Sequence, residues 1–336
     1  MSQRAAHIPE GRTIRFGILG AARIAPKALI DPARRLPEVE VSAVAARKLS
    51  RAREFAASNR IPEARGSYAE LVADPALDAI YIALPNSLHC EWTIAALRVG
   101  KHVLCEKPFA SNENEARAMT AVAQARGMIV AEAFHYCYHP LADRVTELLK
   151  SGVIGRPRDF EASFSVPIPP PNIRYELALS GGATMDLGCY VLHMIRYFAA
   201  LEPRVVEASA TLFGPGLDIA MRARFDFANG AVGSMDCSME PDAVPGARLL
   251  VRGDQGELEV MNPVAPHIGN LVTVRTSAGE RRETVAGETS YTYQLRSFAQ
   301  ALRGAKSIRI DGAEAVTNMR LIDQVYRAAG LAPRGT

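Results

Sequence analysis

The sequence predicts an α/β protein of two domains, a helix-covered parallel sheet followed by a large, open, mainly antiparallel sheet. The chain has 336 residues, and because domains usually hold on the order of 100–200 residues, it is long enough for two. Strand-like runs alternate with helical patterns from Thr13 to about Val130, which is typical of a parallel sheet with both faces covered. After about residue 155, consecutive strand-like runs separated by turns favour an antiparallel or mixed sheet.

The first domain is expected over residues 13–135, after a disordered or loosely docked tail at residues 1–12. Its strand-like runs are short and apolar, and they are Thr13–Leu19, Val39–Ala45, Ala79–Leu84, His102–Cys105 and Met128–Ala131. The helical patterns between them cover Ala22–Leu36, Leu49–Ser58, Leu88–Val99 and Asn112–Arg126. This order predicts repeated strand–helix–strand units.

The second domain is expected over residues 136–330. Its strand-like runs are Asp159–Val166, Val205–Leu212, Ile219–Phe227, Ala231–Met239, Ala247–Gly253 and Glu257–Val260. Asn229-Gly230 lies between two of them and predicts a hairpin. Helical patterns cover Asp186–Ala200, Tyr293–Leu302 and Gly312–Ala329. Whether the final helices pack back on the first domain stays open.

Composition and charge exclude several classes of protein. Hydrophobic residues make up 48% and charged residues 22% of the chain, as in folded globular domains. The net charge of +3 comes without a basic run, which argues against a nucleic-acid partner. Five cysteines without a CxxC spacing predict neither a disulfide framework nor a metal site, and reduced thiols fit the cytoplasm. Neither a signal peptide nor an apolar run long enough to cross a bilayer is visible, so no membrane partner is expected.

The segment Gly20–Ala25 follows the first strand and opens the first helix. It occupies the place of the GxGxxG fingerprint of a Rossmann dinucleotide-binding domain, with Ala22 and Ala25 in place of the later glycines. The first glycine permits a tight turn, small residues let a pyrophosphate approach the backbone, and a helix N-terminus attracts the anion. A plain strand–helix turn is the alternative.

The end of the second strand distinguishes between cofactors. NAD enzymes usually place Asp or Glu there to bind the ribose hydroxyls, whereas this chain has Ala45-Ala46-Arg47-Lys48. A guanidinium instead suits the oxygens of a 2′-phosphate. The sequence therefore favours NADP over NAD, unless Arg47 and Lys48 are ordinary surface charges.

Three further motifs make the pattern more specific. Glu106-Lys107-Pro108 and Pro85-Asn86-Ser87-Leu88-His89 each end a strand, and residues 181–190 read GGATMDLGCY. With the Gly20 loop, and in this order, they resemble the glucose–fructose oxidoreductase/inositol dehydrogenase (Gfo/Idh/MocA) family from the first strand to the last helix. At the position of Tyr190, inositol dehydrogenases have His. The sub-branch of dimeric dihydrodiol dehydrogenase and xylose dehydrogenase has Tyr there, as this chain does. His135 and Cys137 depart from the crossover pattern, which bears on the substrate more than on the reaction.

The resemblance implies an NAD(P)-dependent oxidoreductase that transfers a hydride between nicotinamide and a carbinol or carbonyl carbon of a sugar, polyol or related small molecule. It places cofactor contacts at Gly20, Ala21, Ala22, Arg23, Ile24, Ala46, Arg47, Leu84, Pro85, Asn86, His89, Glu106 and Lys107. For His89 the alternative is a satisfied histidine at a helix start. Substrate contacts are expected at Arg174, His193 and Tyr291, although such residues are often structural.

Hydride transfer to or from such a carbon needs a proton relay at its oxygen, for which Lys107 and Tyr190 are the candidates. A free phenol has a pKa of about 10, and a nearby ammonium lowers it. The resemblance implies that a cis Lys107–Pro108 bond directs the lysine into the site. Asp186 lies one helical turn before Tyr190 and so shares its face; it is expected to orient the lysine or bind substrate hydroxyls, or to be only the helix N-cap.

Two other functions remain open at this point. One is a dehydrogenase or reductase of a non-sugar carbonyl or a dihydrodiol. The other is a non-catalytic dinucleotide-sensing regulator, against which Lys107, Asp186 and Tyr190 argue, because a sensor needs no proton relay. A homo-oligomer, most simply a dimer, is also expected, because the predicted helices are too few to cover both faces of the second sheet and an uncovered apolar face favours association.

Overall fold

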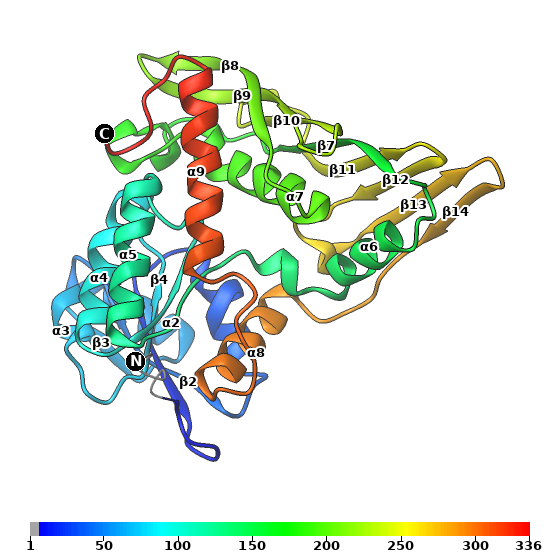
Figure 1. Ribbon diagram of the computed structural model, residues 1–336. Coiled ribbons are helices and arrows are strands. Elements are labelled where there is room, and N and C mark those ends of the chain that lie inside the picture. Colours follow the sequence, from blue (N-terminus) through cyan, green and yellow to red (C-terminus); the bar gives the residue numbers. More distant parts are fainter. Residues whose placement is uncertain (1–6) are drawn as a thin grey trace. The chain divides into compact units, whose positions relative to one another are not determined.

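The computed structural model describes residues 7–336. It divides into two compact units (Figure 1). The first holds the described residues up to His135 and Tyr291–Thr317, and the second holds Tyr136–Ser290 and Asn318–Thr336. In the described part of the chain, none of the helices combines the length and apolar character needed to cross a bilayer.

The first unit is built on a six-stranded parallel sheet, as the sequence predicts. Its strand order is β3-β2-β1-β4-β5-β6, in which the order reverses beside β1, as in a Rossmann fold. The strands are β1 Ile14–Leu19, β2 Val39–Ala45, β3 Glu63–Arg65, β4 Ala79–Ile82, β5 His102–Cys105 and β6 Val130–Glu132. The helices between them include α2 Leu49–Asn59, α3 Tyr68–Val72, α4 His89–Arg98 and α5 Glu113–Arg126. The sequence analysis missed β3 and α3, which are too short to show a period.

The first helical segment begins later than expected. A π-helical turn covers Pro26–Ile30, and a short α-helix, α1, follows at Asp31–Ala33. Pro26 suits the first turn, where its missing N–H has no partner to lose. Pro32 has no N–H to donate to the carbonyl four residues earlier. The N–H of Asp31 donates to the Pro26 carbonyl, five residues earlier. The segment therefore forms a π-helical turn and a short α-helix, and not the single regular helix expected over Ala22–Leu36.

The first unit also includes Ile8, near the start of the described residues, and the segment Tyr291–Thr317. In the expected N-terminal tail, Ile8 is buried and its N–H donates to the Leu302 carbonyl, whereas residues 9–12 are exposed. The rest of that tail, residues 1–6, lies outside the described residues. Helix α8, Ser290–Leu302, contributes Leu295, Phe298 and Leu302 to the core of this unit.

The second unit contains an eight-stranded mixed sheet with the order β14-β13-β12-β11-β7-β10-β9-β8. Only the β7–β10 pair is parallel, and the other neighbours are antiparallel. The strands are β7 Pro157–Ser165, β8 Arg204–Gly214, β9 Leu217–Asp226, β10 Val232–Ser238, β11 Gly246–Gly253, β12 Gly256–Met261, β13 Leu271–Thr276 and β14 Gly279–Glu283. The hairpin at Asn229-Gly230 is confirmed between β9 and β10. The sequence analysis missed β13 and β14.

Helices α6, Pro140–Lys150, and α7, Cys189–Ala199, lie on one face of this sheet (Figure 1). The sequence analysis did not predict α6, although His139 caps it and Pro140 opens it. Helix α7 is buried nearly all round and packs on β7 and β10. Residues 318–328 of the last helix, α9 Gly312–Ala328, also belong to this unit.

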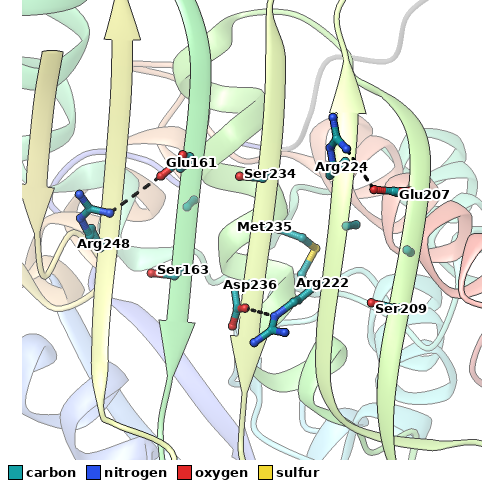
Figure 2. Close-up of a pocket in the computed structure, with 13 residues that line it drawn as sticks. Glu161, Ser163, Glu207, Ser209, Arg222, Arg224, Ser234, Met235, Asp236 and Arg248 are labelled. Carbon is teal, nitrogen blue, oxygen red and sulfur yellow. Dashed lines mark hydrogen bonds and ion pairs between the residues drawn. The ribbon is translucent and has the colours of Figure 1, made fainter.

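The opposite face of the sheet is charged, so the expectation of an uncovered apolar face was wrong. A pocket of about 580 Å³ lies on this face, and Figure 2 shows arginine and acidic side chains among the residues that line it. Arg222 pairs with Asp236 at 2.6 Å and Arg224 with Glu207 at 3.3 Å. Inward and outward residues alternate along a strand, and α7 packs on the other face, against β7 and β10.

Candidate functional site

The predicted cofactor residues meet along one edge of the first sheet. Each group follows the carboxyl end of a parallel strand, where open α/β sheets bind ligands. Gly20, Ala21, Ala22, Arg23 and Ile24 follow β1, Ala46 and Arg47 follow β2, Leu84, Pro85 and Asn86 follow β4, and Glu106 and Lys107 follow β5.

Gly20 occupies a position that only glycine fits. Its φ is +102°, and a Cβ there would overlap the Ala83 carbonyl oxygen. Its N–H donates to the Ala45 carbonyl at 2.9 Å, which ties the loop to the end of β2. The ends of β1, β2 and β4 therefore lie close together at the Gly20 loop, and a pyrophosphate can approach the backbone of this loop.

Arg47 is exposed at the end of β2. Burial raises the pKa of the neighbouring Tyr68, and the Arg47 charge and a backbone hydrogen bond from Arg47 offset part of that rise. Tyr68 in turn packs edge-on against Trp92 at 5.2 Å. The backbone of Arg47 is thus held while its guanidinium stays accessible.

The turn after β5 is held by several hydrogen bonds. The Tyr81 hydroxyl donates to Glu106 Oε1 at 2.5 Å, and the Glu106 N–H donates to the Ile82 carbonyl at 3.0 Å. The Lys107–Pro108 bond is cis, as the resemblance implies. One residue on, the Phe109 N–H donates to Glu132 Oε1 at 2.8 Å. Lys107 therefore projects from a fixed backbone.

His89, predicted as a cofactor contact or as a satisfied histidine at a helix start, is buried and lies next to two backbone carbonyls. It is 1% exposed, and its ring nitrogens lie 2.9 Å from the Pro108 carbonyl oxygen and 3.0 Å from that of Leu84. Burial lowers its pKa, the two carbonyls raise it in part, and the Lys107 charge lowers it further. The ring thus joins the loop after β4 to the Lys107–Pro108 turn.

Tyr291, expected to contact substrate, lies in the first unit. Its ring packs on that of His135 with centroids 3.9 Å apart. Burial raises its pKa, and the charge of Glu106 adds to the rise. Tyr291 is therefore a neutral phenol in the neighbourhood of the Glu106–Lys107 turn.

Asp186 and Arg174 form an ion pair in the second unit. Arg174 Nε donates to Asp186 Oδ2 at 2.5 Å, and the Asn172 side chain also accepts from Arg174. Asp186 lies inside a π-helical turn, Thr184–Gly188, that precedes α7, so it does not occupy the N-cap position. Arg174 holds the carboxylate on which the predicted site depends.

Tyr190 and His193 lie in the first turns of α7. Tyr190 is 5% exposed, and its ring packs edge-on against Phe164 at 5.7 Å. His193 is fully buried, with Nδ1 2.6 Å from the Tyr136 hydroxyl oxygen. This contact lies within the second unit.

The structure thus brings the cofactor residues and Lys107 together in the first unit, and Arg174, Asp186, Tyr190 and His193 in the second. Tyr81 on β4 and Tyr136 in a 3-10 turn, His135–Tyr138, were not predicted, because neither local sequence indicates the hydrogen-bond partner of its hydroxyl. Among the described residues, no group of His, Cys, Asp and Glu is arranged to hold a metal ion, and all five cysteines are free thiols.

Two family models cover most of the chain. Residues 14–134 match the oxidoreductase family with an NAD-binding Rossmann fold, Gfo/Idh/MocA, and residues 143–259 match the Gfo/Idh/MocA C-terminal domain. D-xylose 1-dehydrogenase (NADP⁺) 2 from Haloferax volcanii is 36% identical, over 94% of this chain and 97% of the relative. The chain belongs to the Gfo/Idh/MocA family of oxidoreductases.

Two further similar proteins have names that give different substrates. Trans-1,2-dihydrobenzene-1,2-diol dehydrogenase from Sus scrofa is 33% identical over 74% of this chain and 75% of its own length. A 3-ketoreductase from Actinomadura kijaniata, solved with NADP and TDP-benzene, is 29% identical and superposes with a TM-score of 0.89 over 94% of this chain and 98% of its own. That enzyme has also been solved with a tyrosine replaced by phenylalanine and with a lysine replaced by alanine.

Proposed function

We propose that this protein is an NADP-dependent dehydrogenase or reductase of a sugar, polyol or related small molecule. The observation that carries the proposal is the full-length similarity to an NADP-dependent xylose dehydrogenase, combined with the retained Lys107, Asp186 and Tyr190. A sensor of dinucleotides has no need for these three side chains in one chain.

The residues of the first unit fit a dinucleotide. Gly20 permits a tight turn in which a Cβ would collide with the Ala83 carbonyl oxygen, and the exposed guanidinium of Arg47 suits a 2′-phosphate better than ribose hydroxyls. Bound NADP(H) would supply the hydride acceptor or donor. Gly20 to Ile24 would hold its pyrophosphate, and Arg47 its 2′-phosphate.

Lys107 and Tyr190 are proposed to move the proton at the substrate oxygen. In the oxidation direction, the Tyr190 oxygen would accept the hydroxyl proton of the substrate, and bound NADP⁺ would supply the acceptor for the hydride. The ammonium of Lys107 favours the phenolate form of Tyr190, since an opposite charge stabilises the charged form. Asp186, oriented by Arg174, is proposed to accept a hydrogen bond from a second substrate hydroxyl. The replacement of a tyrosine and a lysine in the related ketoreductase is consistent with such a pair.

A dihydrodiol dehydrogenase is the second candidate, favoured by the 33% identity to the porcine enzyme. An ion pair such as Arg174–Asp186 favours the sugar, because a hydroxyl-rich substrate offers the polar partners that charged groups need.

A substrate panel tests the proposal. The purified protein is mixed with NADP⁺ and, separately, aldoses, cyclitols and trans-dihydrodiols, and reduced nicotinamide is followed by its absorbance. Turnover with an aldose or polyol supports the proposal, and turnover with dihydrodiols alone assigns the second function. Cofactor binding without turnover of any of these, in either direction, would return the protein to the sensor class.

We also propose that the protein is a cytoplasmic homodimer. Five free thiols are consistent with a reducing compartment. The charged face of the second sheet presents arginines and acids in alternating rows, which a second copy related by a twofold axis can pair with its own.

A further inference from the structure

A buried ion pair lies beside the turn that carries Asp186. Asp218 on β9 is fully buried, and Arg334, from the segment after α9, is 3% exposed. The Arg334 guanidinium donates to the Asp218 carboxylate and lies over the Tyr326 ring, 4.3 Å from its centroid. All three residues belong to the second unit.

Arg334 distributes its other donors over two backbone turns. Nε donates to the Gly181 carbonyl at 2.8 Å, and a terminal nitrogen donates to the Gly216 carbonyl at 2.8 Å. A planar guanidinium with five fixed donors is the side chain that satisfies such a set of acceptors. Arg334 therefore joins the hairpin between β8 and β9 to the Gly181-Gly182 turn.

Asp218 reaches the site turn from the other side. Its Oδ2 accepts from the Thr184 N–H at 2.7 Å, and its Oδ1 accepts from the Tyr326 hydroxyl at 3.0 Å. Thr184 begins the π-helical turn that holds Asp186 and leads into α7 with Tyr190. The carboxylate thus satisfies an N–H that the start of a helical segment leaves without an internal partner.

The two glycines explain how the pair comes so close. Gly182 has a φ of +126°, and a Cβ on it would overlap the Asp218 carboxylate, while a Cβ on Gly181 would overlap the Arg174 carbonyl. The Gly182 N–H donates to that same carbonyl at 2.9 Å. One turn therefore fixes both Asp186 and its ion-pair partner Arg174.

We propose that Asp218 and Arg334 are positioning residues for the reaction, because they fix the Gly181–Thr184 turn from which Asp186 and Tyr190 project. This rests on the proposed function of those two side chains. Neither member of the pair touches substrate. Loss of the pair loosens the turn, so the proton relay spends less time in its productive geometry, and turnover falls while the cofactor binds unchanged in the first unit.

The test needs variants that fold. Removing one charge leaves the other buried without a partner, which is strongly destabilising, whereas replacing both avoids that penalty. The main variant is therefore Asp218→Asn/Arg334→Met, in which the asparagine carbonyl can still accept from Thr184. Arg334→Lys keeps the charge but loses the fork. Arg327→Met is the control, since Arg327 is an arginine near the C-terminal end of α9 with an exposed side chain.

Two readouts are measured on each protein. In the double variant, kcat is expected to fall about 10- to 100-fold, with little change in the KM for NADP⁺. In Arg334→Lys, kcat is expected to fall by less than in the double variant. Amide hydrogen exchange over residues 183–190 is expected to be faster in both variants than in the unmodified protein, with no change in α6. The control should match the unmodified protein in both measurements.

The proposal is overturned if either variant folds cooperatively with unchanged kcat and unchanged exchange over residues 183–190. Should the double variant fail to fold, Arg334→Lys decides alone by the same criteria. If the unmodified protein turns over no substrate, the proposed function fails, and exchange alone still decides whether the pair holds the turn.

Discussion

The hydroxyl oxygen of Tyr136 lies 2.6 Å from Nδ1 of His193, and both side chains are buried in the second unit. His193 also stacks on Tyr197 with centroids 5.7 Å apart. The bond joins the segment before α6 to the middle of α7, three residues beyond Tyr190. His193 is thus fixed by packing on the face where the sequence suggested a substrate contact.

Breaking this bond should lower stability more than it slows turnover. Tyr136→Phe is expected to lower the free energy of unfolding by about 1–3 kcal/mol, because the buried imidazole loses a partner. Denaturant unfolding of both single variants and of Tyr136→Phe/His193→Phe measures the coupling. Additive effects of the two substitutions would show that the bond contributes nothing.

Tyr190 and Lys107 should behave as one catalytic unit. Tyr190→Phe is expected to reduce kcat by about 10²–10⁴-fold, since a positioned proton donor typically contributes that much, while NADP⁺ affinity stays nearly unchanged. Lys107→Met should be at least as damaging, and the double variant little worse than the worse single one. In the unmodified enzyme, the pH profile of kcat should show an ionisation that Tyr190→Phe removes. Unchanged turnover in Tyr190→Phe would take the tyrosine out of the mechanism.

Arg47 should determine the preference for NADP(H). Arg47→Asp is expected to weaken NADP⁺ binding by about 10- to 100-fold, equivalent to about 1.4–2.8 kcal/mol, and to strengthen NAD⁺ binding because a carboxylate accepts from ribose hydroxyls. Fluorescence titration with both cofactors measures the change, with Arg53→Asp as a control for net charge. Equal affinity of the unmodified protein for NADP⁺ and NAD⁺ would contradict the assignment.

The protein should form a homodimer that weakens at high salt. Paired charges on the exposed sheet face are screened within about 3 Å at 1 M ionic strength. Light scattering at micromolar concentration should give the mass of a dimer, and the charge reversals Arg222→Glu and Arg224→Glu should lower the association constant. A monomer mass at low salt would rule out the dimer.

The ion pair between Arg144 on α6 and Glu283 on β14 should make stability depend on pH. The hydrogen bonds from Arg144, at 2.7 and 3.1 Å, hold the pKa of Glu283 below its ordinary value despite partial burial. Because the folded-state pKa is the lower one, this stabilisation is present above the unfolded-state pKa of about 4.3 and is lost as the pH falls through the folded-state value.

Glu283→Gln should therefore cost about 1 kcal/mol at neutral pH and almost nothing at the acid end. Thermal unfolding across this pH range measures the difference, with Glu54→Gln as a control at an exposed pair. A cost that does not vary with pH would mean that the side chain acts through packing.

The sequence by itself determined that the first sheet is parallel. It also determined the Gly20 turn, the hairpin at Asn229-Gly230 and the motif around Lys107, because each of these depends on residues adjacent in the chain. Periods of two and 3.6 residues and the positive φ of a glycine are local properties, readable without a partner. The same reasoning failed for β3, which has three residues, and it did not identify β13 and β14.

Only the tertiary structure decided which groups meet. In the folded chain, the ring nitrogens of His89 lie next to two carbonyls, and Nδ1 of His193 lies next to the Tyr136 hydroxyl. The Asp218 carboxylate pairs with Arg334, 116 residues away in the chain. It also placed charge, and not apolar surface, on the open face of the second sheet. A side chain's type states which bonds it can make, but its partner is set by how distant segments pack, and that packing leaves no periodic trace in either segment.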